Sequence, residues 1–310
     1  MNTFGNRFRL TTFGESHGTA VGGVVDGCPA GLPIDNAFVN EELRRRRDGD
    51  TPSKETTQRK EPDHVEWLSG IYEGKTLGTP IAFALRNSDC HPEDYEALRH
   101  CFRPGHADYT YSMRYGHRDY RGGGRASGRE TAARVVGGAI AKLWLKEQGV
   151  SFHTVTKGYT VACTVRGVPA GTGDPVFDRI DARLAYAMIS IPSASAFAMG
   201  QDAGDWQLPS DQYPDQWIDR GEGETLTATN HCGGVQGGIS NGMPIVFHVG
   251  FHPTVTRPEE MICRREDGSL TSVAPGGRHD KSHIPRLPVI VESMAALTVA
   301  DLMLDCMSSQ

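Results

Sequence analysis

Four helices are predicted in this 310-residue chain, and in two of them, after residues 128 and 178, apolar residues recur at helical spacing. The first helix is predicted over residues 36–47, which follow Asp35, a residue type that often caps a helix N-terminus. The clearest is predicted over residues 128–148, where Ser127 and Glu130 have the spacing of a capping box and apolar residues follow at helical intervals. The other two predicted helices begin at residue 178 and span residues 289–307.

Short runs rich in β-branched and aromatic residues lie between these helices and predict strands. The most regular runs are residues 21–25, 65–71, 80–85 and 244–249. A polar stretch with several Gly and Pro residues, 201–223, is predicted to be a long surface loop. Strands mixed with four helices, without an evident boundary, favour a single α+β domain over residues 1–310.

The composition is that of an ordinary globular protein, with 38% hydrophobic and 23% charged residues. The net charge of -6, with His neutral, argues against a nucleic-acid partner or an anionic membrane surface. Seven scattered cysteines without a Cys-x-x-Cys pair predict neither disulfides nor a metal site, which fits a reducing cytoplasm. No apolar signal stretch opens the chain, and no later segment is expected to reach the length of a membrane span.

The strongest chemical signal is a glycine- and arginine-rich approach to the clearest predicted helix. Arg121 and Arg125 flank Gly122-Gly123-Gly124, and Arg129 follows inside the first turn. Free backbone amides at a helix N-terminus, a glycine-rich approach and flanking guanidinium groups together favour an anion-binding site. The alternative is an ordinary helix cap with arginines on the surface.

Two histidines lie in turn-like segments that suit proton transfer. His17 stands between Ser16 and Gly18 before a predicted strand, and His106 follows Pro104-Gly105. Imidazole titrates near neutral pH and is the side chain most often used to move protons. Taken alone, the motif around His17 favours the ordinary explanation, a residue that only bonds loop carbonyl groups.

Three further segments each allow two interpretations. Arg44–Arg47 end a predicted helix, so they either complement its dipole or clamp an anion together with Lys54 and Arg59. Arg278-His279-Asp280 is either a structural ion pair or a tuned acid–base group. Residues 233–242 form tight turns or a flat backbone surface for a planar ligand, and their glycine spacing does not fit the dinucleotide fingerprint.

Taken together, these segments resemble the chorismate synthase family. The signatures that carry the resemblance are residues 14–29, 124–138 and, in part, 278–292. Similar segments occur at 56–63, 103–109 and 237–242, and the likeness runs from about Phe4 to Asp301.

The resemblance implies a β-α-β sandwich with helices between antiparallel sheets, assembled as a homotetramer. It implies reduced FMN as cofactor and 5-enolpyruvylshikimate-3-phosphate as substrate. The expected reaction is a 1,4-elimination of phosphate that yields chorismate without net redox change. Family members differ in whether they reduce FMN with NADPH or depend on a separate flavin reductase. The competing interpretation is a degenerate relative that binds flavin or an anionic metabolite without turnover.

The resemblance also implies three groups of site residues. The expected catalytic residues are His17 near the leaving phosphate, His106 and Asp280 near the flavin, and Ser16 and Ser127 as hydroxyl relays. The expected substrate-binding residues are Arg46, Arg47, Lys54, Arg103, Arg129 and Arg278. The expected flavin contacts are Arg125, Ala126, Ser127, Gly237, His252, Pro253, Thr254, Val255, Thr256 and Arg278.

The chain departs from the family pattern mainly on the flavin side. The altered positions are His252 for Lys, Pro192-Ser193 for Asn-Ala, Ser195–Ala198 for Lys-Gly-x-Glu, Lys281-Ser282 after Asp280, and Lys54 where Arg is more usual. A stretch of tens of residues that usually follows the helix containing Trp144 is also missing. Because a fixed cation beside the flavin is lost, we expect weaker FMN binding than is typical, which flavin titration followed by fluorescence quenching would measure.

Overall fold

The structure is a computed structural model that describes residues 1–50, 61–219, 225–254, 260–274 and 282–309. Of the expected site residues, those outside the described ranges are Lys54, Val255, Thr256, Arg278 and Asp280, and the altered position Lys281 is outside them too.

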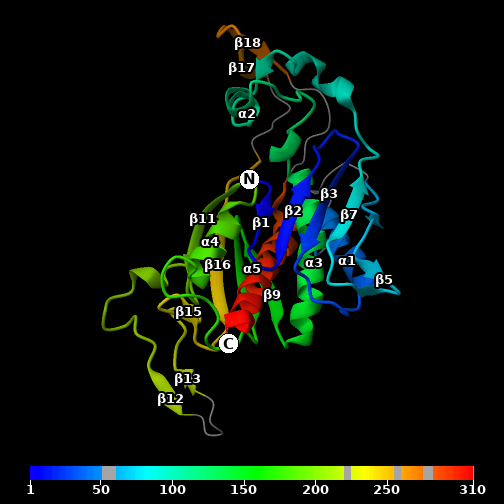
Figure 1. Cartoon of the computed structure of the whole chain (residues 1–310). Helices are drawn as coiled ribbons and strands as arrows, with labels where there is room; N and C mark the ends of the chain where they lie inside the picture. Colours follow the sequence, from blue (N-terminus) through cyan, green and yellow to red (C-terminus); the bar gives the residue numbers. More distant parts are fainter. Residues whose placement is uncertain (51–60, 220–224, 255–259, 275–281, 310) are drawn as a thin grey trace.

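Two antiparallel sheets form the outer layers of the main body (Figure 1). The five-stranded sheet has the order β1-β2-β3-β7-β4 and consists of β1 (Thr3–Phe4), β2 (Arg9–Phe13), β3 (Ala20–Asp26), β7 (Ile81–Arg86) and β4 (Val65–Trp67). The four-stranded sheet has the order β11-β16-β10-β9 and consists of β11 (Ala194–Met199), β16 (Ile245–Phe251), β10 (Thr160–Arg166) and β9 (Ser151–Lys157).

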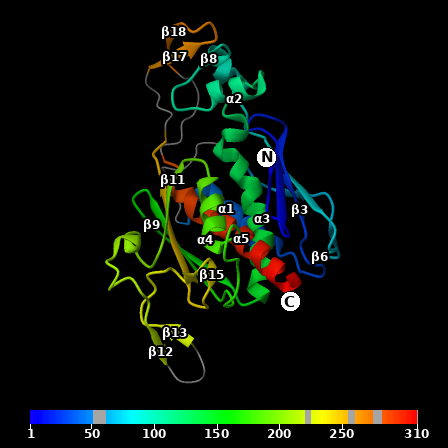
Figure 2. The same cartoon turned by 60° about the vertical axis from the view of Figure 1, so that its left-hand side comes forward.

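A layer of helices separates the two sheets, as Figure 2 shows from a second side. The helices are α1 (Asn36–Asp48), α3 (Thr131–Glu147), α4 (Ile180–Ile189) and α5 (Leu287–Ser309). The α3 helix packs on β2 and β3, and α5 packs on β9 and β10. The expected α+β fold with helices between antiparallel sheets is therefore confirmed.

Burial follows the strand period on the inner faces of the sheets. In β10, Val161, Cys163 and Val165 are fully buried, while the residues between them face outward. The α3 helix is buried on nearly all sides because it lies in the middle layer. The apolar core thus lies within the helix layer and the two sheet faces that cover it.

A smaller lobe lies at one end of the sandwich (Figure 1). It consists of the 3-10 helix η1 (Pro92–Leu98), β8 (Cys101–Phe102), α2 (Asp108–Tyr115), β17 (Met261–Arg265) and β18 (Leu270–Val273). Strand β17 pairs with both β18 and β8, which joins two distant parts of the chain. The remaining strands are the hairpins β5 (Ile71–Tyr72) with β6 (Lys75–Thr76), β12 (Trp217–Asp219) with β13 (Thr225–Thr227), and β14 (Val235–Gln236) with β15 (Ile239–Ser240).

The helix over residues 128–148 exists, but its predicted capping box is wrong. The chain forms 3-10 turns at η2 (Gly124–Ala126) and η3 (Gly128–Glu130) before α3 begins. The Ser127 hydroxyl accepts a hydrogen bond from the backbone N–H of Arg129, as a cap should. Glu130 instead accepts a hydrogen bond from the distant Thr12 hydroxyl at 2.8 Å and pairs with Arg134 one helical turn further along, because these two partners occupy its carboxylate.

Other boundaries differ by a few residues. The α1 helix forms as predicted, α4 begins two residues late, and α5 begins two residues early after η5 (Ile284–Arg286). The predicted strand 65–71 is split between β4 and β5, and the predicted loop 201–223 contains η4 (Asp205–Gln207) and β12.

The expectation that no segment reaches the length of a membrane span is wrong. Ile284–Ser308 is long enough, with a mean hydropathy of 1.7, but 94% of its most apolar window is buried inside the protein. This segment is the central helix of the core.

A buried ion network joins three helices to one sheet. The Lys142 ammonium on α3 donates to the carboxylates of Glu42 on α1 and Glu292 on α5. Arg45 donates two hydrogen bonds to Glu292, and the Thr154 hydroxyl of β9 donates a third. Burial alone would raise the Glu292 pKa, but the Arg45 hydrogen bonds and the Lys142 charge outweigh it and lower the pKa to about 2.

We predict that Glu292→Gln destabilises the fold by about 3–5 kcal/mol, because it removes one of the two buried carboxylates that compensate Lys142 and Arg45. The wild-type contribution of Glu292 is fully present above the ordinary Glu pKa and is lost as the pH falls toward about 2. Urea unfolding at pH 7 and at pH 3 measures both effects. The control Glu66→Gln removes an exposed pair with Arg86 and should change stability little. Equal stability of the two variants at pH 7 would contradict the prediction.

Candidate active site

A recess of about 540 Å³ gathers most of the expected site residues. We call it the arginine recess, and its expected residues are Ser16, His17, Arg46, Arg47, Arg103, His106, Ala126, Ser127, Arg129, His252, Pro253 and Thr254. Two described residues of the prediction do not line it. Arg125 donates to the carbonyl oxygens of Thr12 and Gly14, and Gly237 lies in the turn between β14 and β15.

His17 is held on the turn that follows β2. Its Nδ1 lies 3.1 Å from the Ser16 hydroxyl, and its ring packs nearly perpendicular to the Tyr95 ring with centroids 4.8 Å apart. Gly122 lies against the same Nδ1 edge of the ring, because a Cβ added there would lie only 2.4 Å from Nδ1. Gly122 also has φ +77°, so both its conformation and this close approach require glycine.

Two buried guanidinium groups share one carboxylate beside the start of α3. Arg129 forms an ion pair with Asp63 and donates to the Asn87 amide oxygen at 2.9 Å. Arg46 donates to the Gly128 carbonyl oxygen at 2.9 Å and lies 3.5 Å from the Asp63 carboxylate. The side chains of Arg46, Asp63 and Arg129 are 6%, 1% and 4% exposed. Within this trio, positive charge exceeds negative charge in a site from which water is largely excluded.

Arg103 supports the His17 site rather than adding uncompensated charge. Its guanidinium donates two hydrogen bonds to the Asp108 carboxylate and one, at 3.0 Å, to the Gly122 carbonyl oxygen. Burial would raise the Asp108 pKa, but the Arg103 hydrogen bonds outweigh it and hold the pKa below its usual value. Arg103 therefore fixes the loop whose glycine touches His17. Arg47, at the rim, pairs with Asp48.

The remaining walls suit a ligand with both anionic and planar parts. Gly128, directly before α3, lines the recess, and a Cβ added there would meet no protein atom within 4 Å. Its φ is not in the left-handed region, so close approach of a ligand is a better reason for glycine than the chain's own packing. The lining also includes the apolar residues Ile191, Pro192, Leu287 and Ile290.

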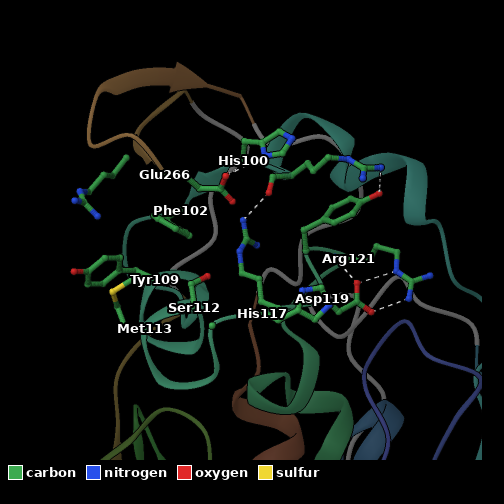
Figure 3. Close-up of a pocket in the computed structure, with 14 residues that line it drawn as sticks. His100, Phe102, Tyr109, Ser112, Met113, His117, Asp119, Arg121 and Glu266 are labelled. Carbon is green, nitrogen blue, oxygen red and sulfur yellow. Dashed lines mark hydrogen bonds and ion pairs between the residues drawn. The ribbon is translucent and has the colours of Figure 1, made fainter.

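A second, larger recess of about 990 Å³ lies in the lobe (Figure 3). Its charges are largely paired locally: Arg121 binds Asp119, and His100 contacts Glu266. The Arg121 and His100 side chains are 40% and 72% exposed, so solvent screens them. We therefore place the functional site in the smaller arginine recess, where the cations are buried.

Sequence reasoning missed several lining residues. Tyr95 and His283 carry no motif of their own, and only the fold brings them to the recess, whereas Ser193 was expected beside the flavin as an altered position. Asp63 ends the segment 56–63 that resembles the family, which was its one sequence signal. Among the described residues, no group of three or more His, Cys, Asp or Glu side chains is placed to hold a metal.

An α+β sandwich with buried arginines, two histidines and a helix N-terminus around one recess defines an enzyme that acts on a small polyanion. The comparisons give the family. The chorismate synthase family model matches residues 8–159 and 154–304, so the chain belongs to the chorismate synthase family. It is accordingly an enzyme of the lyase class that acts on a small phosphoester and forms chorismate in the shikimate pathway.

Similar proteins support this membership over nearly the whole chain. A chorismate synthase from Azobacteroides pseudotrichonymphae is 43% identical, with 97% of this chain and 98% of the relative covered. One from Christiangramia forsetii is 43% identical, with 100% and 99% covered. A crystal structure of chorismate synthase aligns with a TM-score of 0.74 at 26% identity and covers 97% of this chain and 93% of its own.

The alignments also bear on the missing stretch. The alignment with the Azobacteroides relative spans 350 positions, more than the 310 residues of this chain, so the relative carries tens of residues without a counterpart. The two segments matched by the family model meet at residues 154–159. These residues lie in β9 and its short turn to β10, shortly after α3.

We predict that Gly122→Ala lowers the rate of chorismate formation on the order of 10²-fold, because the added methyl group must displace the His17 ring. The control Gly116→Ala imposes a similar backbone strain, at φ +69°, but meets no atom within 4 Å. Steady-state rates and melting temperatures of both variants distinguish displacement of the His17 ring from general backbone strain. Equal rates in the two variants would refute the assignment of Gly122.

Proposed function

We propose that the chain eliminates phosphate from 5-enolpyruvylshikimate-3-phosphate within the arginine recess, with reduced FMN bound beside the substrate. The observation that carries this proposal is the convergence of His17 and His106 with the buried Arg46 and Arg129 around one recess. The substrate carries a phosphate and two carboxylates, so it presents nearly four negative charges.

The two buried arginines of the recess suit that substrate. Two unit charges about 4 Å apart interact by roughly 4 kcal/mol at an effective dielectric constant of 20. Arg46 and Arg129 are already buried, with Asp63 as their shared carboxylate, so part of their desolvation cost is met by folding. We propose that these two arginines bind the anionic groups and that Arg47 closes the rim.

The residues present also fit a flavin. The open space at Gly128 and the apolar residues Ile191, Pro192 and Leu287 form a wall suited to a planar ring, and His252–Thr254 lie along it. When bound, reduced FMN supplies electron density to the substrate ring as the phosphate departs.

Side chains of the protein then transfer protons and stabilise charge. His17, as imidazolium, neutralises the leaving phosphate, while its ring is oriented by the Ser16 hydroxyl, Tyr95 and Gly122. His106 lies on the turn after Arg103 and stabilises charge on the flavin side. Ser127 caps the start of the helix and lines the recess as a hydroxyl relay.

Other expectations extend the proposal. Asp280 as a proton relay, and Lys54 and Arg278 as substrate ligands, lie outside the described residues. Arg125 and Gly237 stay proposed flavin contacts although they do not line the recess. We further propose one domain over residues 1–310, a homotetramer and a cytoplasmic location.

One observation favours the second candidate, a relative that binds without turnover. The altered positions Pro192, Ser193 and His252 all line the recess, and they gather on the proposed flavin side. Measured turnover decides between the two candidates.

We predict that His17→Ala and His106→Ala each lower the rate by on the order of 10²–10⁴-fold, since each removes a group that acts in proton transfer or charge stabilisation. The assay measures phosphate release under anaerobic conditions with chemically reduced FMN. The control His153→Ala alters an exposed residue of β9 and should retain wild-type turnover. Near-wild-type rates in both site variants would remove the assignments, and an inactive wild type would favour the relative without turnover.

A further inference from the structure

Ser193 has an unusual backbone conformation at the wall of the arginine recess. It lies between α4 and β11 with φ 71°, in the left-handed region that favours glycine and asparagine. Among the described residues other than glycine, only Asp63, Glu73 and Ser193 have positive φ. Such a conformation persists where the surroundings hold it in place.

Two hydrogen bonds from other parts of the chain hold Ser193. Its carbonyl oxygen accepts from the His252 backbone N–H at 3.0 Å. Its hydroxyl lies 2.9 Å from Nε2 of His283, which is 90 residues away in the sequence. Ser193, His252 and His283 all line the recess. One serine therefore joins three separate segments of a single wall.

The hydrogen bond from the His252 backbone N–H to Ser193 lies just beyond the end of a strand. Strand β16 ends at Phe251, and 252–254 continue along the recess without sheet pairing. Within the described residues, the bond to Ser193 is the one backbone hydrogen bond that ties 252–254 to another segment. The position of that segment therefore depends on the position of Ser193.

We propose that Ser193 is a positioning residue that, through His283 and His252, fixes the flavin-facing wall and so sets the affinity for FMN. This inference rests on the proposed function, which places the flavin along 252–254. A wall held in its binding geometry before the ligand arrives loses less conformational entropy on binding. The hydroxyl suits this task because it can donate to a neutral imidazole nitrogen or accept from a protonated one.

The test is FMN titration followed by fluorescence quenching, with wild type, Ser193→Ala, His283→Ala and the double variant. Each single change should raise the FMN dissociation constant about tenfold, as expected for one lost hydrogen bond to a ring nitrogen. The double variant should bind no more weakly than either single variant, because both remove the same interaction.

Further variants distinguish loss of the Ser193–His283 hydrogen bond from relief of backbone strain at Ser193. Ser193→Gly relieves the left-handed conformation but lacks the hydroxyl, so it should weaken FMN binding as Ser193→Ala does. The control Ser190→Ala removes a hydroxyl that bonds Ala187 and Arg134 outside the recess, and it should bind FMN like wild type. Melting temperatures without ligand should stay close to wild type in the glycine and control variants.

The outcomes distinguish this inference from the proposed function. Normal FMN binding by Ser193→Gly, or additive effects of the Ser193 and His283 changes, would overturn the proposed positioning role of Ser193. Either result would leave the proposed function unaffected. A wild-type chain that does not bind FMN would overturn both.

Discussion

The proposed site depends on two guanidinium groups that the fold buries beside one shared carboxylate. Arg46 and Arg129 are buried beside the start of α3 and share the Asp63 carboxylate. Such an arrangement is costly unless hydrogen bonds fix every group and a further anion completes it. The sandwich supplies the fixed frame, since the network around Lys142 and Glu292 joins α1, α3 and α5 beneath the recess.

The position of His17 also depends on a buried charged group that hydrogen bonds hold in place. Arg103 is neutralised by Asp108 and donates to the Gly122 carbonyl, and Gly122 in turn touches His17. The buried Arg103–Asp108 ion pair thereby fixes the loop that contacts the His17 ring. Along the other wall, polar contacts centred on Ser193 stand where the family pattern has Asn-Ala and a lysine. The substrate side is thus maintained by buried charge and the flavin side by hydrogen-bonded segments.

Sequence patterns predicted the features that depend on interactions between residues close together in the chain. Capping residues located α1 and helical periodicity located α3, while the glycine-rich approach to residue 128 indicated an anion site among residues that line the recess. The capping box failed because Thr12, distant in sequence, bonds Glu130. Contacts such as Tyr95 with His17 or Ser193 with His283 leave no periodic pattern, since they arise only when distant loops meet. The family resemblance, not periodicity, supplied the cofactor and the reaction.

The most direct test of the proposed role of the buried arginines is calorimetric titration of 5-enolpyruvylshikimate-3-phosphate into Arg129→Gln and Arg99→Gln. Arg99 is 47% exposed and lines the lobe recess, so its loss should leave the affinity unchanged. Loss of Arg129 should weaken binding on the order of 10²-fold, the upper range for hydrogen bonds to a charged group. Equal affinities for the two variants, with the fold of both intact, would contradict the account.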